Sequence, residues 1–296
     1  CAVEFIRRTA NYEQFPLLLD LVGVPDESCR AAVTRTLGDL ATRLSQRLRT
    51  GDLSILAGHE TAALKNHRSM MLGELNIRTS HFERLPNPEP VLRTLMTIGR
   101  PDDNAVRNLM FDRGENCRNA SLALLKDDSQ PELLDLLFDY LTHFAPPPCI
   151  VDIIRTRSDV DFILHFLNRM PERPSKFLKA NLSKLQNLTW VKNWTTTIDR
   201  LPTSVHDRLV SVADHVPLDE GVTTELKTWM VRHADAAARE ASSEVLSLLP
   251  VEEASRILQD ALVDDDPEIE AWATHCLRSQ KLPDTFKQLL SRRFDF

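Results

Sequence analysis

Several side chains in this 296-residue chain have types and spacings that could support chemistry. Two dipeptides pair an imidazole with a carboxylate, a combination that can bind a metal ion or transfer a proton: His59-Glu60 and His206-Asp207. Neither has a second ligand at helical spacing, which favours a surface or capping role. The aspartates at 264–266 superficially resemble a cation site, but they precede a proline and suit a helix N-terminus. The sequence therefore predicts no catalytic, cofactor-binding or metal-binding residue.

One aromatic pair is a candidate contact site. Trp190 and Trp194 are four residues apart and would share one face of a helix, with Asp199 five residues further on. Two tryptophans at this spacing favour packing inside the protein, and the alternatives are a contact site for a protein partner or a platform for a ligand. We therefore include Trp190 and Trp194 as candidate partner-binding residues.

Arginines form the second candidate surface, on a helix predicted from Glu27 to Arg49. Arg43 and Arg47 share a face at i, i+4 and could meet an acidic protein patch or a phosphate backbone, although an ordinary solvated face is the alternative. The chain as a whole has a net charge of −7. It lacks the broad basic field that nucleic-acid binding needs, so the sequence favours a protein partner.

The five cysteines are scattered without a C-x-x-C pair, which argues against a disulfide framework or a zinc site. Cys29 and Cys117 fall at apolar positions, so we expect buried thiols in a reducing, cytoplasmic compartment. No apolar run reaches the roughly 18 residues that span a bilayer. The chain begins with Cys1, which we interpret as the start of a piece of a longer repeat protein; a lipid-bearing Cys1 is the alternative.

The elements that must position these residues are predicted to be helices. Glycine is scarce, at 8 residues, and strand-like alternation bounded by Asn-Gly or Asp-Gly turns is absent. Proline-rich stretches at 85–90, 146–148 and 170–174 should interrupt the helices. We expect N-terminal repeats over 1–145 and C-terminal repeats over 146–296, in one array. Pro146–Pro148 marks either a bend in it or an ordinary loop.

A short register recurs along the chain: an apolar residue, an arginine, a small residue three positions later and a leucine four positions beyond it. Its four copies are Cys29–Leu37, Cys117–Leu125, Ala238–Leu246 and Ile269–Leu277. Their starts are separated by 88, 121 and 31 residues, close to multiples of about 30, and such a period is typical of helical arrays. In the last two copies a second apolar helix follows, so each unit forms a hairpin that must stack on a neighbour.

These residues resemble the HEAT-repeat family, in its short form of roughly 30 residues seen in many bacterial proteins and in bilin-lyase-type repeats. The resemblance lies in Pro267–Ala273, Asp235–Ala241 and Glu27–Ala32, and Glu270 departs from it because the family has arginine there. It implies an all-α fold, an α-solenoid of stacked antiparallel helical hairpins in a right-handed superhelix. It implies little about activity.

The first functional hypothesis is a non-catalytic scaffold or adaptor that presents a concave face to a protein partner of unknown identity. The alternative is an enzyme or enzyme subunit on the same array, similar to bilin lyases or to helical-repeat DNA glycosylases, which hold a damaged nucleotide with Trp and Asp side chains. A third hypothesis is a structural segment of a larger protein. Trp190, Trp194 and Asp199 discriminate among them, because burial would weaken the enzyme hypothesis.

The register predicts the effect of one core truncation. Leu246→Ala should lower the free energy of unfolding by roughly 2–5 kcal/mol. Hydrogen exchange should show loosening in the adjoining repeats, because each repeat of an array contacts only its neighbours. Uniform loosening from the first residue onward would contradict the array.

Overall fold

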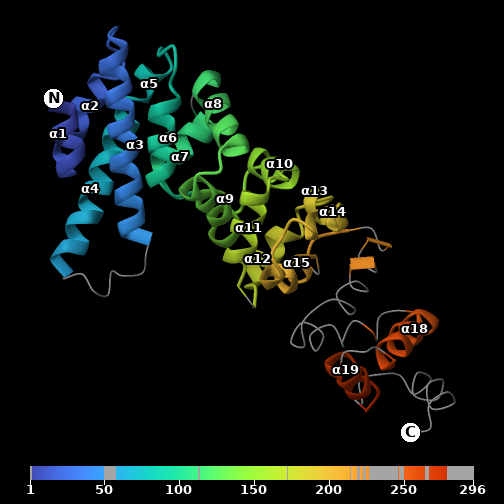
Figure 1. Ribbon diagram of the computed structural model, residues 1–296. Helices are drawn as coiled ribbons and strands as arrows, with labels where there is room; N and C mark the ends of the chain where they lie inside the picture. Colours follow the sequence, from blue (N-terminus) through green and yellow to red (C-terminus); the bar gives the residue numbers. More distant parts are fainter. Residues whose placement is uncertain are drawn as a thin grey trace. The chain divides into compact units, whose positions relative to one another are not determined.

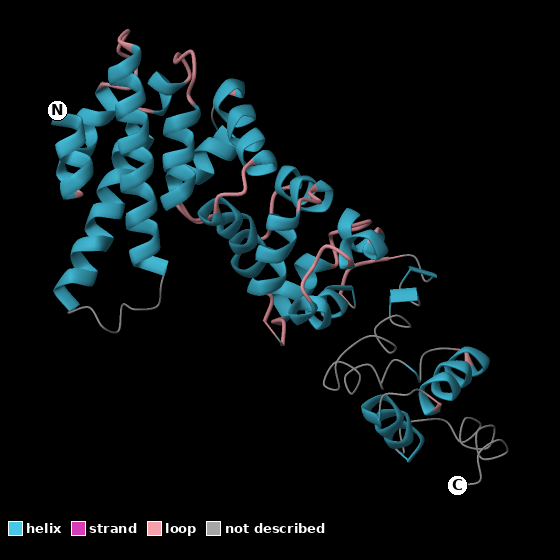
Figure 2. Ribbon diagram, viewed as in Figure 1, coloured by secondary structure: helices cyan, strands magenta, loops and turns pink. Residues whose placement is uncertain are grey.

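The computed structural model is all-helical over the residues that it describes (Figures 1 and 2), which confirms the predicted fold class. These residues form seventeen α-helices and no strand. The described ranges are 2–49, 58–112, 114–171, 173–213, 215–218, 221–222, 225–226, 246, 250–263 and 267–278. The chain divides into two compact units, Cys1–Ile154 and Arg155–Phe296. The predicted division at residue 145, with its bend at Pro146–Pro148, stays a prediction.

The first unit contains ten helices along the described chain. They are α1 (Ala2–Thr9), α2 (Phe15–Asp20), α3 (Glu27–Arg49), α4 (Gly58–Ile77), α5 (Thr79–Phe82), α6 (Glu89–Ile98), α7 (Asn104–Arg107), α8 (Glu115–Asp127), α9 (Pro131–His143) and α10 (Pro148–Thr156). A 3₁₀ turn, η1 (Tyr12–Gln14), follows α1, and a π-helical turn, η3 (Asn108–Asp112), follows α7. Helix α3 has the bounds predicted from the sequence.

Proline sets two of the helix starts. Helix α6 begins at Glu89 with Pro90 in its first turn, and α10 begins at Pro148 after a loop at 144–147. As predicted, no described helix runs through 85–90 or 146–148, because proline lacks an N–H and its ring restricts the preceding residue; α6 and α10 begin near the ends of these stretches.

Helix α3 forms the centre of the first unit and packs against α1, α4 and α6. Its inward face is a row of fully buried leucines, Leu37, Leu40 and Leu44. Polar contacts join its C-terminal half to α9. Gln46 donates to the Glu132 carboxylate at 3.3 Å, and Arg49 pairs with Asp135 at 2.6 Å.

The repeat register lies on the buried faces of α3, α8 and α19 (Pro267–Arg278). At the small-residue position Val33, Ser121 and Ala273 are fully buried, whereas the residues at the arginine position are exposed. Cys117 is buried as expected, but Cys29 is only half-buried because it lies in the first turn of α3. The copy at 238–245 lies outside the described residues; Leu246, which ends it, is buried.

The N-terminus of α8 is capped by a side chain from an earlier segment. The Glu83 carboxylate accepts a hydrogen bond from the Cys117 N–H at 3.3 Å. A Cβ atom at Gly114 would lie 2.6 Å from that carboxylate, so glycine leaves the space that the cap occupies. This contact fixes the position of α8 against the 82–85 turn.

The second unit contains seven further described helices. They are α11 (Val160–Arg169), α12 (Lys176–Leu182), α13 (Thr189–Lys192), α14 (Trp194–Ile198), α15 (His206–Ala213), α18 (Val251–Leu262) and α19. Helices α18 and α19 pack together around Leu246, Ile257 and Ala273. Helix α18 confirms the second apolar helix predicted to follow the copy ending at Leu246. The predicted cap at 264–266 and the matching helix through Phe286–Leu290 lie outside the described residues.

Helix α11 begins at a charged contact that is partly buried. Asp159 caps the helix by accepting from the Phe162 N–H at 3.0 Å, and it receives two hydrogen bonds from Arg157 at 2.8 and 2.9 Å. The Arg157 guanidinium also lies 4.9 Å from the centre of the Phe162 ring. Burial opposes ionisation of Asp159, but the bonds from Arg157 and Phe162 outweigh it, so the pKa of Asp159 lies below its ordinary value.

This contact predicts a pH-dependent loss of stability. Asp159→Ala should lower the free energy of unfolding at pH 7 by about 0.5–2 kcal/mol through loss of the cap. Because the folded-state pKa is depressed, the charge contributes stability above the ordinary aspartate pKa of about 3.9 and loses it as the pH falls through the folded-state pKa. Urea unfolding at pH 7 and pH 3 measures the difference between wild type and variant. A difference that grows at pH 3 would contradict this account.

Candidate partner-binding surface

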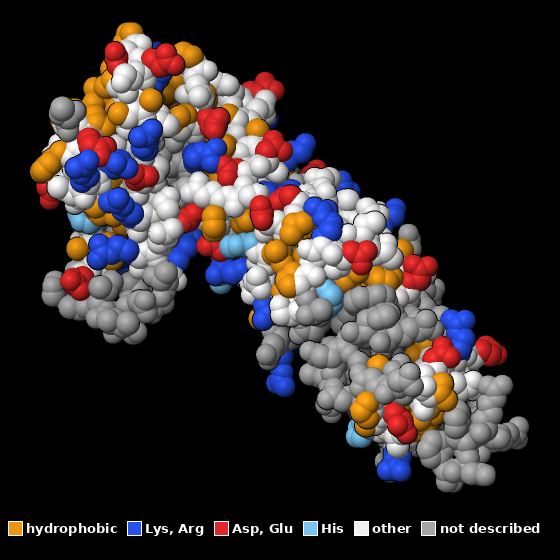
Figure 3. Space-filling model, in the orientation of Figure 1, with side chains coloured by type: hydrophobic (Ala, Val, Ile, Leu, Met, Phe, Trp, Pro, Cys, Tyr) orange, Lys and Arg blue, Asp and Glu red, His pale blue; other side chains and the backbone are white. Residues whose placement is uncertain are grey.

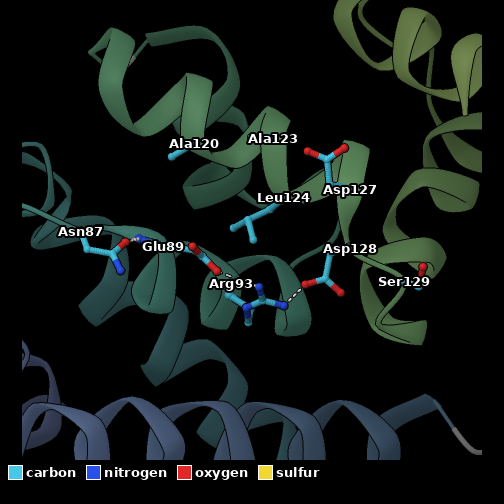
Figure 4. A pocket seen from close by; sticks show the side chains of 9 residues that line it. All are labelled: Asn87, Glu89, Arg93, Ala120, Ala123, Leu124, Asp127, Asp128 and Ser129. Atoms are coloured by element: carbon cyan, nitrogen blue, oxygen red, sulfur yellow. Dashed lines mark hydrogen bonds and ion pairs between the residues drawn. The ribbon is translucent and has the colours of Figure 1, made fainter.

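An open groove of about 490 Å³ lies in the first unit, between the start of α6 and the end of α8 (Figure 4). Ala120, Ala123 and Leu124 of α8 supply its small and apolar lining. Polar and charged residues complete it: Asn87, Glu89, Arg93, Asp127, Asp128 and Ser129. Residues more than thirty positions apart in sequence therefore meet here, because α6 packs against α8.

Two carboxylates of the groove are held by one arginine. Arg93 donates to Glu89 at 2.8 Å and pairs with Asp128 (Figure 4). Asp128 also accepts from the Gln130 N–H at 2.7 Å, which fixes its orientation. Asn87 is fixed in a similar way, since its side chain accepts from the Glu89 N–H at 3.0 Å. This rim of the groove is therefore pre-organised.

Asp127 differs from its neighbours because none of the residues that the structure describes bonds to it. It is exposed and is the last residue of α8. A carboxylate at a helix C-terminus is unfavourable, because the helix dipole places negative charge there. With Glu89, Asp127 and Asp128 against Arg93, the groove carries excess negative charge. Its geometry suits a cationic side chain with a short apolar neighbour.

A second pocket, of about 460 Å³, adjoins the groove and shares Asn87 with it. Its lining comes from the loop before α3, from the first half of α3, and from the turn before α6 with the first turn of that helix: Val22, Glu27, Arg30, Ala31, Thr34, Arg35, Asn87 and Pro90. Arg30 donates to the Val24 carbonyl at 3.2 Å, whereas Arg35 is exposed. The second pocket thus carries excess positive charge beside the acidic groove.

Both predicted arginines lie on the surface of the first unit. Arg43 and Arg47 are exposed on α3, and Arg43 donates to the Arg7 carbonyl at 2.9 Å, at the end of α1. Basic side chains gather over α1 and α3 in Figure 3. Arg7 itself pairs with Glu4 and with Asp39. The helical-face prediction for Arg43 and Arg47 is consistent with this placement, and their role stays a prediction.

The two predicted tryptophans are core residues in the second unit. Trp190 is 0% and Trp194 is 6% exposed. The Trp190 ring packs edge-to-face on Phe166 at 5.7 Å, and Phe166 contacts Phe162. The two tryptophans also do not share one helix, since α13 ends at Lys192 and α14 begins at Trp194. Burial therefore does not support a partner-contact role for either side chain.

Each histidine–carboxylate pair is only partly covered by the described residues. The His206 ring nitrogen lies 3.2 Å from the Leu201 carbonyl, which is a local capping contact, and the side chains of His59 and Asp207 lie outside the described residues. Among described side chains, no group of three or more His, Cys, Asp or Glu is placed to hold a metal ion.

Sequence reasoning missed the groove. One available signal was the pair of aspartates that ends the predicted helix containing Cys117–Leu125, because acidic residues there oppose the helix dipole. The contribution of Asn87, Glu89 and Arg93 had no such signal, since it depends on how α6 and α8 pack.

Comparison with models of known protein families finds no match, and comparison with curated protein sequences finds none either. Within the described chain, none of the helices is both long and apolar enough to cross a bilayer.

The placement of Trp190 predicts that its removal acts on stability. Trp190→Ala should lower the free energy of unfolding by about 3–5 kcal/mol, because it removes a fully buried ring from an aromatic cluster. Phe177→Ala on α12, where the ring is 44% exposed, is the matched control and should change stability by about 0.5 kcal/mol or less. Chemical unfolding measures both. A stable Trp190→Ala protein would contradict the core placement.

Proposed function

We propose that this chain is a non-catalytic scaffold or adaptor that binds a protein partner. The observation that carries the proposal is the pair of adjoining pockets on the first unit, which share Asn87 and carry opposite excess charge. Open, shallow pockets with small residues beneath a charged rim suit an extended polypeptide segment, which supplies side chains of both kinds.

The complementary partner segment follows from the lining residues. A lysine or arginine would pair with Asp127, and a small apolar residue would lie over Ala120 and Ala123. An acidic residue further along the segment would pair with Arg35 in the second pocket. Because Asn87 and the Arg93 ion pairs are already oriented, binding there would require little further ordering of the protein.

The proposal includes a HEAT-like α-solenoid as the architecture. Support comes from the register, whose small and leucine positions are buried in α3 and α8 while its arginine positions are exposed. The packing of α18 on α19 around the same register is further support. In such an array the core consists of stripes shared between neighbouring helices, which leaves the ends and outer faces of helices to bind partners.

The enzyme alternatives receive no comparable support. The glycosylase-like hypothesis requires Trp190 and Trp194 on an accessible surface, and both are buried. The bilin-lyase-like hypothesis rested on the repeat resemblance alone, which does not specify an activity.

Site-specific photo-crosslinking in the source cells tests whether the groove contacts a protein. A benzophenone amino acid at position 123, which lines the groove, should give a discrete protein adduct. The same residue at position 118 is the control, because Arg118 is exposed on another side of α8 and does not line the groove. Adducts of equal yield and identity at both positions, or none at position 123, would refute the proposed surface.

A charge reversal separates binding from stability. Asp127→Lys should abolish the position-123 adduct by repelling the cationic side chain of the partner. The same change should raise the free energy of unfolding by about 0.3–1 kcal/mol, because a cation suits a helix C-terminus. Crosslinking yield and chemical unfolding measure the two effects. The control is Asp102→Lys, which reverses an exposed charge outside both pockets and should leave the adduct intact.

If Asp127→Lys lowered the free energy of unfolding, unfolding could account for the loss of the adduct. The expectation that a cation stabilises the C-terminus of α8 would then be wrong. An adduct that persists in a folded Asp127→Lys protein would exclude the acidic groove as the contact site.

A further inference from the structure

Two polar groups in the first unit lie in contact, and neither has a hydrogen-bonding partner among the described residues. The Tyr12 hydroxyl of η1 is buried and has no hydrogen bond. The His67 ring of α4 lies against the Tyr12 ring, with 4.9 Å between their centres, and its nitrogens bond to no described residue. Arg47 of α3 is exposed and forms no ion pair with any of them. A buried donor without an acceptor is unfavourable, so an acceptor supplied by a ligand would stabilise it.

The same region contains a second arginine. Arg43 donates to the Arg7 carbonyl at 2.9 Å, which places its guanidinium at the C-terminal end of α1, shortly before η1. Arg47 follows one turn later on α3. Burial raises the pKa of the Tyr12 hydroxyl, and the positive charges of Arg47 and Arg43 oppose that rise, so both lie within electrostatic reach of the hydroxyl.

The carboxylates nearest along α1 and α3 are already engaged elsewhere. Glu4 pairs with Arg7 and Arg8, and Asp39, one turn before Arg43, pairs with Arg7. The described residues therefore supply no anion to Arg43 and Arg47, although the two guanidinium groups are adjacent on one helix face. An oxygen-rich anion would pair with both guanidinium groups and could accept a hydrogen bond from the Tyr12 hydroxyl.

We propose that Tyr12, Arg43, Arg47 and His67 form a binding site for a phosphate group. The guanidinium of Arg47 offers parallel N–H donors of the kind that bind phosphate oxygens, and the Tyr12 hydroxyl and a His67 ring N–H add donors from two other elements. A phosphate group carries close to two negative charges, which matches two arginines better than the single charge of a carboxylate does.

Access to the hydroxyl requires one side-chain movement. The Tyr12 oxygen is shielded from water in this structure, so a ligand reaches it only after a neighbouring side chain moves. Arg47 can turn without breaking a described contact, and Arg43 can keep its bond to the Arg7 carbonyl through one nitrogen while the others bind the ligand. The site lies outside the two pockets and does not depend on the scaffold proposal.

Isothermal titration of the full chain with inorganic phosphate, at constant ionic strength, tests the site. Wild type should bind one phosphate saturably, with acetate at least tenfold weaker. Arg47→Gln should weaken phosphate binding by about tenfold or more, as expected for loss of a charge-assisted hydrogen bond. Tyr12→Phe should weaken it several-fold while leaving the ring packing against His67 in place.

Arg84→Gln is the matched control, because Arg84 is an exposed arginine of the same unit outside the site and without a described ion pair. It should leave phosphate binding unchanged. Equal weakening by Arg84→Gln and Arg47→Gln would show general charge attraction and overturn the proposal. Absence of saturable phosphate binding, or acetate binding as tight as phosphate, would also overturn it.

Titration with O-phosphoserine identifies the source of the phosphate group. If phosphoserine binds more tightly than inorganic phosphate and shows the same losses in Arg47→Gln and Tyr12→Phe, the site recognises phosphate carried on a larger molecule. If it binds more weakly with those losses, the site takes free phosphate. Circular dichroism of each variant confirms that the loss of binding does not reflect unfolding.

Discussion

Burial of the apolar face of α3 is the constraint on which the described first unit depends. Leu37, Leu40 and Leu44 are removed from water only because α1, α4 and α6 pack around the same helix. An isolated amphipathic helix gains little from its own hydrogen bonds, so neighbours must cover its stripe. Once they do, the outward positions of α3 are set as well, so Arg43 and Arg47 lie on the surface and Arg43 reaches the end of α1.

The same packing places both candidate surfaces. Helix α6 contacts α3 on one side and α8 on the other, so the proline-rich turn before α6 lies between the two pockets. Asn87 belongs to that turn and lines both. Because proline restricts the backbone there and the Asn87 side chain accepts from the Glu89 N–H, the boundary between acidic and basic pockets is stiff.

Periodicity and proline predicted the helices well, and tertiary packing decided the rest. The bounds of α3 and the buried small position in α8 and α19 follow from spacing, because a stripe repeats every three or four residues. The paired tryptophans could not be placed that way. Residues at i and i+4 share a face only within one helix, and here the helix is interrupted at Asn193. The Trp190 ring therefore packs against Phe166 in the core. The groove needed Asn87 and Asp127 to meet, which no local pattern encodes.

Two residues of the first unit lie in unfavourable environments, and both belong to the proposed binding surfaces. Asp127 lies at the C-terminus of α8 without an ion pair to a described residue, and Tyr12 buries a hydroxyl without an acceptor. Some charged groups of the unit are compensated, since Glu83 caps α8 and Asp128 is held by Arg93, whereas the Ser45 and Tyr140 hydroxyls are buried without a hydrogen bond, like that of Tyr12. The two proposed ligands would each satisfy one such group, because a cation would offset the charge at the end of α8 and an anion would accept from the Tyr12 hydroxyl.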